Sequence, residues 1–215
     1  PNEANQVTLY GFPVSQPTRS CKMLLHAGGV AFEDKFISIF TGEQKKPEYL
    51  AINPKGFVPA IKHGDFVLSE GAAILQYIAE SFNLSSWYPT DVQTHARVNE
   101  WLHWVHTSIR QTSTVGIVRP VFMKQQFDEE AAMTAHTNAI QLLETQLGKT
   151  KFLVGDEPTI ADLFVIPEID QLVLFGKFDY SKSHPNIARW LNDFKQFEWY
   201  NNNIKEVVTV LQSAK

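Results

Sequence analysis

The spacing of hydrophobic and polar positions changes along the chain, from short strand-like runs to long helical ones. The first 83 residues contain four short apolar runs typical of strands, at 7–10, 32–40, 58–62 and 66–69. Helical spacing predicts a helix from about Pro17 to Gly28, a short turn over 47–50 and a helix over 70–82. The last of these has an apolar face made of Ala73, Ile74, Tyr77 and Ile78. The predicted order is therefore βαβ followed by ββα.

This order also predicts how the strands pair. A helix that connects two strands of one sheet normally makes a right-handed crossover, so the first two strands should pair in parallel. The third and fourth strands are separated only by His63-Gly64-Asp65, which favours an antiparallel hairpin. We therefore expect one mixed sheet in the first part of the chain.

The rest of the chain has a helical pattern throughout. A linker at 84–93, rich in Ser and Pro, precedes five helices predicted at about 94–118, 128–147, 159–174, 185–197 and 201–213. Pro167 should kink the third helix or restart it. Thr159 and Asp162 are spaced as a capping box, which begins a helix. The sequence thus predicts an α/β domain over 1–83 and an all-α domain over 94–215.

The hydrophobic content and the net charge of the chain exclude some classes of function. The chain has 215 residues, 44% hydrophobic, with a net charge of −4. Apolar content this high is enough for a core, and the weakly acidic balance argues against a dedicated nucleic-acid binder. No run of 18 apolar residues exists, so no membrane span is expected.

The cysteine and histidine content narrows the possible chemistry. A single cysteine, Cys21, excludes an internal disulfide and a cysteine-based zinc site, and it fits a reducing compartment. His103 and His106 have metal-ligand spacing, but no third ligand is evident, so we expect no metal. We expect Cys21 itself to be buried in the first helix, the common fate of a free cysteine.

Three stretches contain residues that could bind a ligand or take part in catalysis. Pro59 either opens an ordinary strand, the reading that the letters alone favour, or follows a cis bond that leaves the Val58 N–H and C=O facing outward for an extended peptide. Glu70 and Gly71 begin a helix, whose N-terminus suits a carboxylate, although Ser69 as a plain N-cap is the alternative. Ser15 lies between strand and helix and is, taken alone, more often a cap than a catalyst.

The predicted topology places these three stretches at the same end of one sheet. Together they supply a hydroxyl at a helix start, a strand edge and a second helix start. A peptide-like ligand that carries carboxylates and a thiol would find a partner in each of them.

Several motifs then resemble one family. Val14-Ser15-Gln16-Pro17-Thr18-Arg19 is similar to the theta-class pattern around a catalytic serine, and 42–48 and 53–60 are similar to the phi-class pattern. Residues 152–155 with 159–162 resemble the N-capping box of the family's helical domain. Over essentially its whole length the chain resembles a cytosolic glutathione S-transferase of the serine-type theta/phi group. The resemblance implies a thioredoxin-like N-terminal domain followed by an all-helical one.

The resemblance also implies roles for particular residues. The Ser15 hydroxyl would donate to the glutathione sulfur, and the thiolate would attack a small hydrophobic electrophile, with glutathione as co-substrate and no cofactor. Arg110 resembles a theta-class arginine that favours the thiolate, and a solvated helix arginine is the alternative. The implied glutathione-binding residues are Gln44, Lys45, Phe57, Val58, Pro59, Glu70 and Gly71. The implied electrophile pocket, between the domains, is lined by Phe12, Pro13, Val14, Ile109, Ser113 and Ile117.

Three positions depart from the family pattern. Phe57 stands where a polar residue is usual, Gly71 where a Ser or Thr is usual, and Gln44 where the phi pattern has His. Each loses a hydrogen bond to a charged ligand group, worth about 1.5–3 kcal/mol unless it is replaced. The sequence therefore predicts weak glutathione binding or substitute contacts.

The remaining expectations concern setting and alternatives. The resemblance implies a cytoplasmic homodimer that binds neither nucleic acid nor membrane. Glutathione-dependent peroxidase or dehalogenase activity is an alternative within the same chemistry. A non-catalytic ligand carrier or protein-interaction module of the same fold is the alternative from another class. The changes at Phe57 and Gly71 count for it, and the presence of Ser15 and Arg110 counts against it.

Overall fold

The computed structural model describes residues 6–213, and its contacts divide the chain into two compact units. The first unit contains the chain up to Ser85 and the segment from Phe197 onward. The second unit is Ser86–Gln196.

A mixed four-stranded sheet forms the centre of the first unit. Its strands are β1 (Val7–Gly11), β2 (Phe32–Phe36), β3 (Ala60–His63) and β4 (Phe66–Ser69). The strand order is β2-β1-β3-β4, with β1 and β2 parallel and the other two pairs antiparallel. This confirms the predicted βαβ–ββα order and pairing, although β2 is shorter than the predicted run of 32–40.

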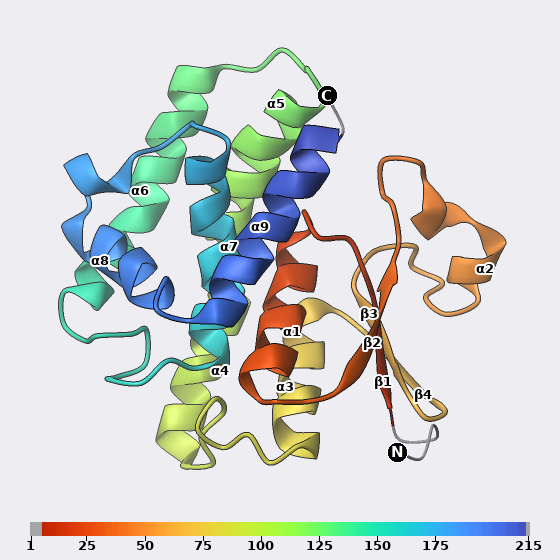
Figure 1. Cartoon of the computed structure of the whole chain (residues 1–215). Helices are drawn as coiled ribbons and strands as arrows, with labels where there is room; N and C mark the ends of the chain where they lie inside the picture. The colour runs from red at the N-terminus through yellow and green to blue at the C-terminus, as the bar shows by residue number, and fades with distance from the viewer. Residues whose placement is uncertain (1–5, 214–215) are drawn as a thin grey trace. The chain divides into compact units, whose positions relative to one another are not determined.

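Four α-helices and a short 3₁₀ turn complete the first unit. They are α1 (Gln16–Ala27), η2 (Glu43–Lys45), α2 (Pro47–Leu50), α3 (Gly71–Ser81) and α9 (Glu198–Ser213). Figure 1 shows α1 and α3 on one side of the sheet and α2 on the other. Leu24 of α1 and Ile74 and Ile78 of α3 are fully buried, so the two helices share the core beside the sheet.

The last helix belongs to this first unit. Arg19, almost fully buried on α1, donates through Nε to Oδ1 of Asn203 on α9 at 2.8 Å. Lys22 forms ion pairs with Glu206 of α9, at 2.7 Å, and with Asp34 of β2. The sequence placed this helix in the domain 94–215, and its return to α1 was not part of that prediction. The division at the linker 84–93 stays a prediction.

The second unit is helical. Its elements are α4 (Val92–Thr107), the π-helix η3 (Gln111–Val118), α5 (Arg119–Phe122), α6 (Glu129–Leu147), α7 (Ile160–Leu174), the 3₁₀ turn η4 (Tyr180–Lys182) and α8 (Pro185–Phe194). The single helix predicted over 94–118 is wrong in its second half, which is wound as a π-helix. The predicted restart at Pro167 is also wrong, since α7 continues through it.

The start of α7 is fixed by the predicted capping box. Oδ2 of Asp162 accepts from the Thr159 N–H at 2.9 Å, and the Thr159 hydroxyl accepts from the Ala161 N–H at 3.3 Å. Oδ1 of Asp162, which is fully buried, also accepts from the Leu153 N–H and the Trp190 indole N–H, both at 3.0 Å. One carboxylate therefore joins the start of α7 to the preceding loop and to α8.

Across the described residues, no helix combines the length and the apolar character that crossing a bilayer requires.

Candidate functional site

Ser15 stands at the N-cap position of α1, directly after the turn that follows β1. Its carbonyl accepts from the Arg19 N–H at 2.9 Å, but its side chain makes no capping hydrogen bond. Serine at this position normally uses its hydroxyl to satisfy a first-turn N–H. The plain-cap alternative is therefore wrong for the side chain, and the half-buried hydroxyl is left beside the positive end of a helix.

Cys21 lies further along the same helix and is fully buried, as expected. Its Sγ is 3.8 Å from the carbonyl oxygen of Gly71, at the start of α3. Burial raises the pKa of the Cys21 thiol far above its usual range, so this sulfur is not a thiolate at neutral pH. Thiol chemistry in this protein needs a sulfur supplied by a ligand.

The loop before β3 presents the backbone of Val58. The Val58–Pro59 peptide bond is cis, and β3 begins only at Ala60. The prediction that Pro59 opens an ordinary strand, which the sequence alone favours, is therefore wrong. Within the described residues neither the N–H nor the C=O of Val58 has a hydrogen-bond partner. The adjoining Phe57 carbonyl accepts from the Tyr49 hydroxyl at 2.6 Å and the Asn53 amide at 2.7 Å. Two side chains thus fix the Phe57–Val58 peptide through its carbonyl, while its N–H and the following Val58 carbonyl stay unpaired within the described residues.

The short turn η2 packs against this loop. Gly56 has a φ of 64°, and a Cβ there would lie 2.8 Å from Nζ of Lys45 and 3.0 Å from the Gln44 carbonyl oxygen. The same Nζ lies 4.5 Å from the ring centroid of Phe57, whose side chain is 68% exposed. Oε1 of Gln44 is buried and has no hydrogen-bond partner within the described chain. Such a group is normally satisfied in a native structure, so it marks a place for a ligand contact.

Glu70 is the N-cap of α3 and has a φ of 79°, unusual for a residue with a side chain. It makes no capping bond, and Nζ of Lys55 lies 3.0 Å from its Oε1. The alternative that Ser69 caps this helix is wrong, because Ser69 ends β4 and the helix begins at Gly71. Backbone strain of this kind is common at binding sites.

The sheet register brings these stretches together. Tyr10, near the end of β1, pairs with Ala60, the first residue of β3. Ala60 pairs in turn with Ser69, the last residue of β4. Ser15, Val58 and Glu70 therefore follow or precede neighbouring strands at one end of the sheet, as the sequence predicts.

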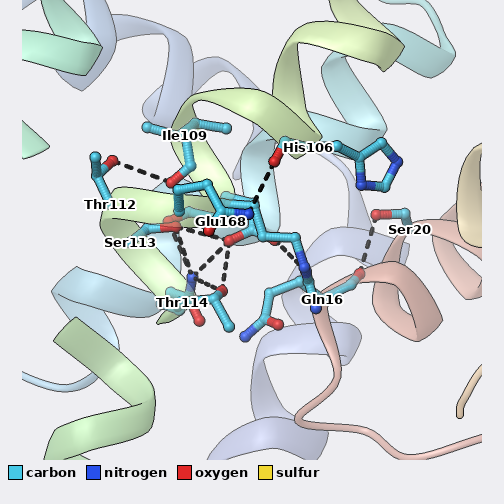
Figure 2. Close-up of polar contacts among 11 residues, drawn as sticks. Gln16, Ser20, His106, Ile109, Thr112, Ser113, Thr114 and Glu168 are labelled. Carbon is cyan, nitrogen blue, oxygen red and sulfur yellow. Dashed lines mark hydrogen bonds and ion pairs between the residues drawn. The ribbon is translucent and has the colours of Figure 1, made fainter. Parts of the chain in front are cut away.

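Arg110, in the second unit, forms an ion pair with a buried carboxylate. Its Nη1 donates to Oε1 of Glu168 at 2.5 Å, and Glu168 is only 1% exposed. Oε2 of Glu168 accepts from Ser113 at 2.7 Å and Thr114 at 2.5 Å, as Figure 2 shows, and from Gln171 at 3.0 Å. The solvated-arginine alternative is therefore wrong.

Sequence reasoning did not single out Glu168. The available signal was the acidic pair Glu168 and Asp170 in the middle of a mostly apolar helix, because a carboxylate is seldom fully buried unless it is paired.

The residues assigned to the electrophile pocket are mostly buried. Phe12 is fully buried and meets the rings of Phe36 and Phe40 edge-on at 5.4 and 4.6 Å, whereas Pro13 and Val14 are half-buried. Ile109 and Ser113 are fully buried, and Ile117 packs with Val118 and Leu172. Their role in electrophile binding stays a prediction.

Metal-ligating side chains do not cluster in the part of the chain that is described. No group of three or more His, Cys, Asp or Glu side chains there could hold an ion. The chemistry of the site in the first unit is that of hydroxyl, backbone, carboxylate and ammonium groups.

Comparison with known proteins adds two family-model matches. The model for the glutathione S-transferase N-terminal domain matches residues 5–80, and that for the C-terminal domain matches residues 109–197. Human glutathione S-transferase theta-2B is 35% identical over 192 residues, 86% of this chain and 78% of the relative. Glutathione S-transferase 1 of Dianthus caryophyllus is 28% identical over 221 residues, 100% of this chain and 98% of the relative.

Solved structures are similar over nearly the whole length. An epsilon-class glutathione S-transferase from the housefly, Musca domestica, has a TM-score of 0.87 at 27% identity, covering 97% of this chain and 98% of its own. Human glutathione S-transferase T1-1 in its apo form has a TM-score of 0.85 at 29% identity, covering 95% and 88%. The fold of this chain is therefore similar to that of glutathione S-transferases over nearly its whole length.

Proposed function

Because the chain belongs to the glutathione S-transferase family, we propose that the Ser15 hydroxyl stabilises the thiolate of glutathione during transfer. The protein is a transferase that conjugates glutathione, its co-substrate, to electrophiles. The observation that carries the role of Ser15 is its hydroxyl, which lies at the start of α1 and makes no capping bond.

The chemistry of this step follows from the pKa of the thiol. A free thiol has a pKa of about 8.5, so only a small fraction is thiolate at neutral pH. A hydroxyl that donates to the sulfur, beside the positive end of a helix, favours the charged form and lowers that pKa. The thiolate then attacks the electrophilic carbon, and Ser15 never forms a covalent bond.

The rest of glutathione would be held by the surrounding backbone and charges. Val58, whose N–H and C=O have no partner within the described residues, would pair with the cysteinyl segment as a strand does. Glu70 would bind the γ-glutamyl ammonium, and the Gly71 N–H its carboxylate. Gln44 and Lys45 would bind the glycyl carboxylate, with the ring of Phe57 against Lys45.

Arg110 keeps its proposed role as a cation that favours the thiolate. Its guanidinium is held in place by Glu168, yet 28% of its side chain is exposed. The proposal for Arg110 rests on the resemblance of its surroundings to the theta-class pattern.

We further propose that the protein works as a homodimer in the cytoplasm. Phe66 and Val67 on the sheet-edge strand β4 are 47% and 40% exposed, and exposed apolar edges are usually covered in an assembly. A free, buried Cys21 is the usual state of a cysteine in a reducing compartment.

Replacement of Ser15 by alanine tests the proposed function. Ser15→Ala should lower kcat about 10- to 100-fold, the cost of one hydrogen bond to a charged group. The measurement is turnover of a model aryl halide with saturating glutathione. Ser20→Ala is a matched control on the same helix, because the Ser20 hydroxyl donates to the Gln16 carbonyl at 3.0 Å and not to a ligand (Figure 2). Equal kcat in wild type and Ser15→Ala would remove Ser15 from the mechanism.

A further inference from the structure

We propose that Lys55 is a specificity-determining residue, which together with Glu70 forms a receptor for the α-amino-acid end of glutathione. The inference rests on the proposed function and adds a contact to it. Nζ of Lys55 and Oε1 of Glu70 are 3.0 Å apart, and both side chains are more than half exposed. The pair is therefore open to a ligand that approaches from solvent.

The backbones of both residues are held in place. The buried Asn53 accepts from the Lys55 N–H through Oδ1 at 3.2 Å, and its carbonyl accepts from the Gly56 N–H at 2.9 Å. Glu70 is fixed in its left-handed conformation between β4 and α3. Two rigid backbone positions thus bring an ammonium and a carboxylate side by side.

The charges of this pair match those of an α-amino acid. In such a group the amino nitrogen and the carboxyl carbon are about 2.5 Å apart. Oε2 of Glu70 accepts no hydrogen bond within the described residues, so it can take the ligand's ammonium while Oε1 keeps Lys55. The ligand's carboxylate then lies beside Lys55, and four charges of alternating sign form a ring.

The contact of Lys55 with the γ-glutamyl carboxylate takes the place of the hydroxyl contact that is lost at Gly71. Gly71 has no hydroxyl to donate to the γ-glutamyl carboxylate, whereas the Lys55 ammonium has three donors and a full charge. Lys45, held over the ring of Phe57, is a separate cation on the η2 side of the loop. Two lysines and one glutamate therefore match the two carboxylates and one ammonium of glutathione.

The test compares KM and kcat for two thiols. In Lys55→Ala, KM for glutathione should rise about tenfold with kcat unchanged, because the lost contact is far from the sulfur. Lys55→Arg should restore KM. Lys182→Ala removes an exposed lysine that pairs with Asp179 and should change neither constant. A glutathione analogue with its γ-glutamyl α-carboxylate converted to an amide should have a KM about tenfold higher than glutathione in wild type. In Lys55→Ala the rise should be clearly smaller, because only the contact with the Gly71 N–H is affected there.

The outcomes separate this inference from the proposed function. An unchanged or lower KM in Lys55→Ala overturns it, and a lower value would mean that Lys55 competes with the ligand's ammonium for Glu70. An equal penalty for the amide analogue in both proteins also overturns it. In either case a loss of kcat in Ser15→Ala would leave the proposed function standing. A wild-type protein that shows no turnover with either thiol would overturn both.

Discussion

At the scale of single residues, the site depends on side chains that fix backbone groups and leave their neighbours unpaired. Tyr49 and Asn53 donate to the Phe57 carbonyl and so fix the Phe57–Val58 peptide, whose N–H has no partner within the described residues. Burial raises the pKa of Tyr49 to about 12, which keeps its hydroxyl a donor at any physiological pH. The binding edge is thus rigid before the ligand arrives.

Removal of one of these donors should weaken both stability and binding. Asn53→Ala loses the bonds to the Phe57 carbonyl and the Lys55 N–H and should cost about 1–3 kcal/mol of unfolding free energy, with a higher KM for glutathione. Tyr49→Phe keeps the Asn53 bonds and should cost only about 1 kcal/mol. Urea unfolding together with steady-state kinetics measures both effects. A variant Asn53→Ala with wild-type stability and KM would show that the loop does not need this side chain.

The sequence indicated some of these residues and not others. Ser15, Val58 and Glu70 were found because each stands within two residues of Pro or Gly in a motif with a fixed backbone consequence. The cis bond was only the less favoured of two alternatives. The roles of Asn53 and Tyr49 were not predicted, because they depend on a carbonyl that both side chains reach only in the folded loop. Whether a polar side chain caps a helix or binds a ligand is likewise decided by its surroundings in the folded protein.

At the scale of elements, local patterns predicted helices and strands well but not their irregularities. The helical period over 94–118 is real, yet η3 is a π-helix whose Ser113 and Thr114 both donate to Glu168 of α7. That partner lies more than 50 residues along the chain, so no local pattern reports it. A capping box such as Thr159 and Asp162 was predictable because its two residues are neighbours in sequence.

Loss of the buried carboxylate should destabilise this pair of elements strongly. Glu168→Ala leaves Arg110 and three further donors without their acceptor and should cost about 3–5 kcal/mol. Glu129→Ala is the matched control: its ion pair with Lys177 is half-exposed and should be worth about 0–1 kcal/mol. Chemical unfolding monitored by circular dichroism compares them. Similar unfolding midpoints for the two variants would contradict the structural role given to Glu168.

At the scale of the whole molecule, the chain returns to its beginning. Arg19 and Asn203, like Lys22 and Glu206, are 184 residues apart in sequence and bonded in the fold. The sequence placed the last helix with the other helices. Its amphipathic pattern shows that one face is buried, but it does not show which element covers that face. Partner choice over such a separation comes from complementary surfaces that no window of sequence contains.

Stability should also depend on pH through one buried histidine of the second unit. His136 bonds to Tyr180 at 3.0 Å, and burial, with the nearby charge of His184, lowers its pKa to about 4. The folded state then binds fewer protons than the unfolded state, so stability falls as pH drops from about 6.5 to about 4, by roughly 3 kcal/mol. Unfolding free energies across this range should show a smaller slope in His136→Asn, whereas the exposed His103→Asn should keep the wild-type slope. Equal slopes in all three would contradict this assignment.

The most direct test of the central claim is the pKa of the glutathione thiol in the bound state. It is measured from the ultraviolet absorbance of the thiolate against pH, in wild type and in Ser15→Ala. Wild type should lower this pKa clearly below the free value of about 8.5, and Ser15→Ala should raise it again by about 1–2 units. An identical thiol pKa in the two proteins would show that the Ser15 hydroxyl does not stabilise the thiolate.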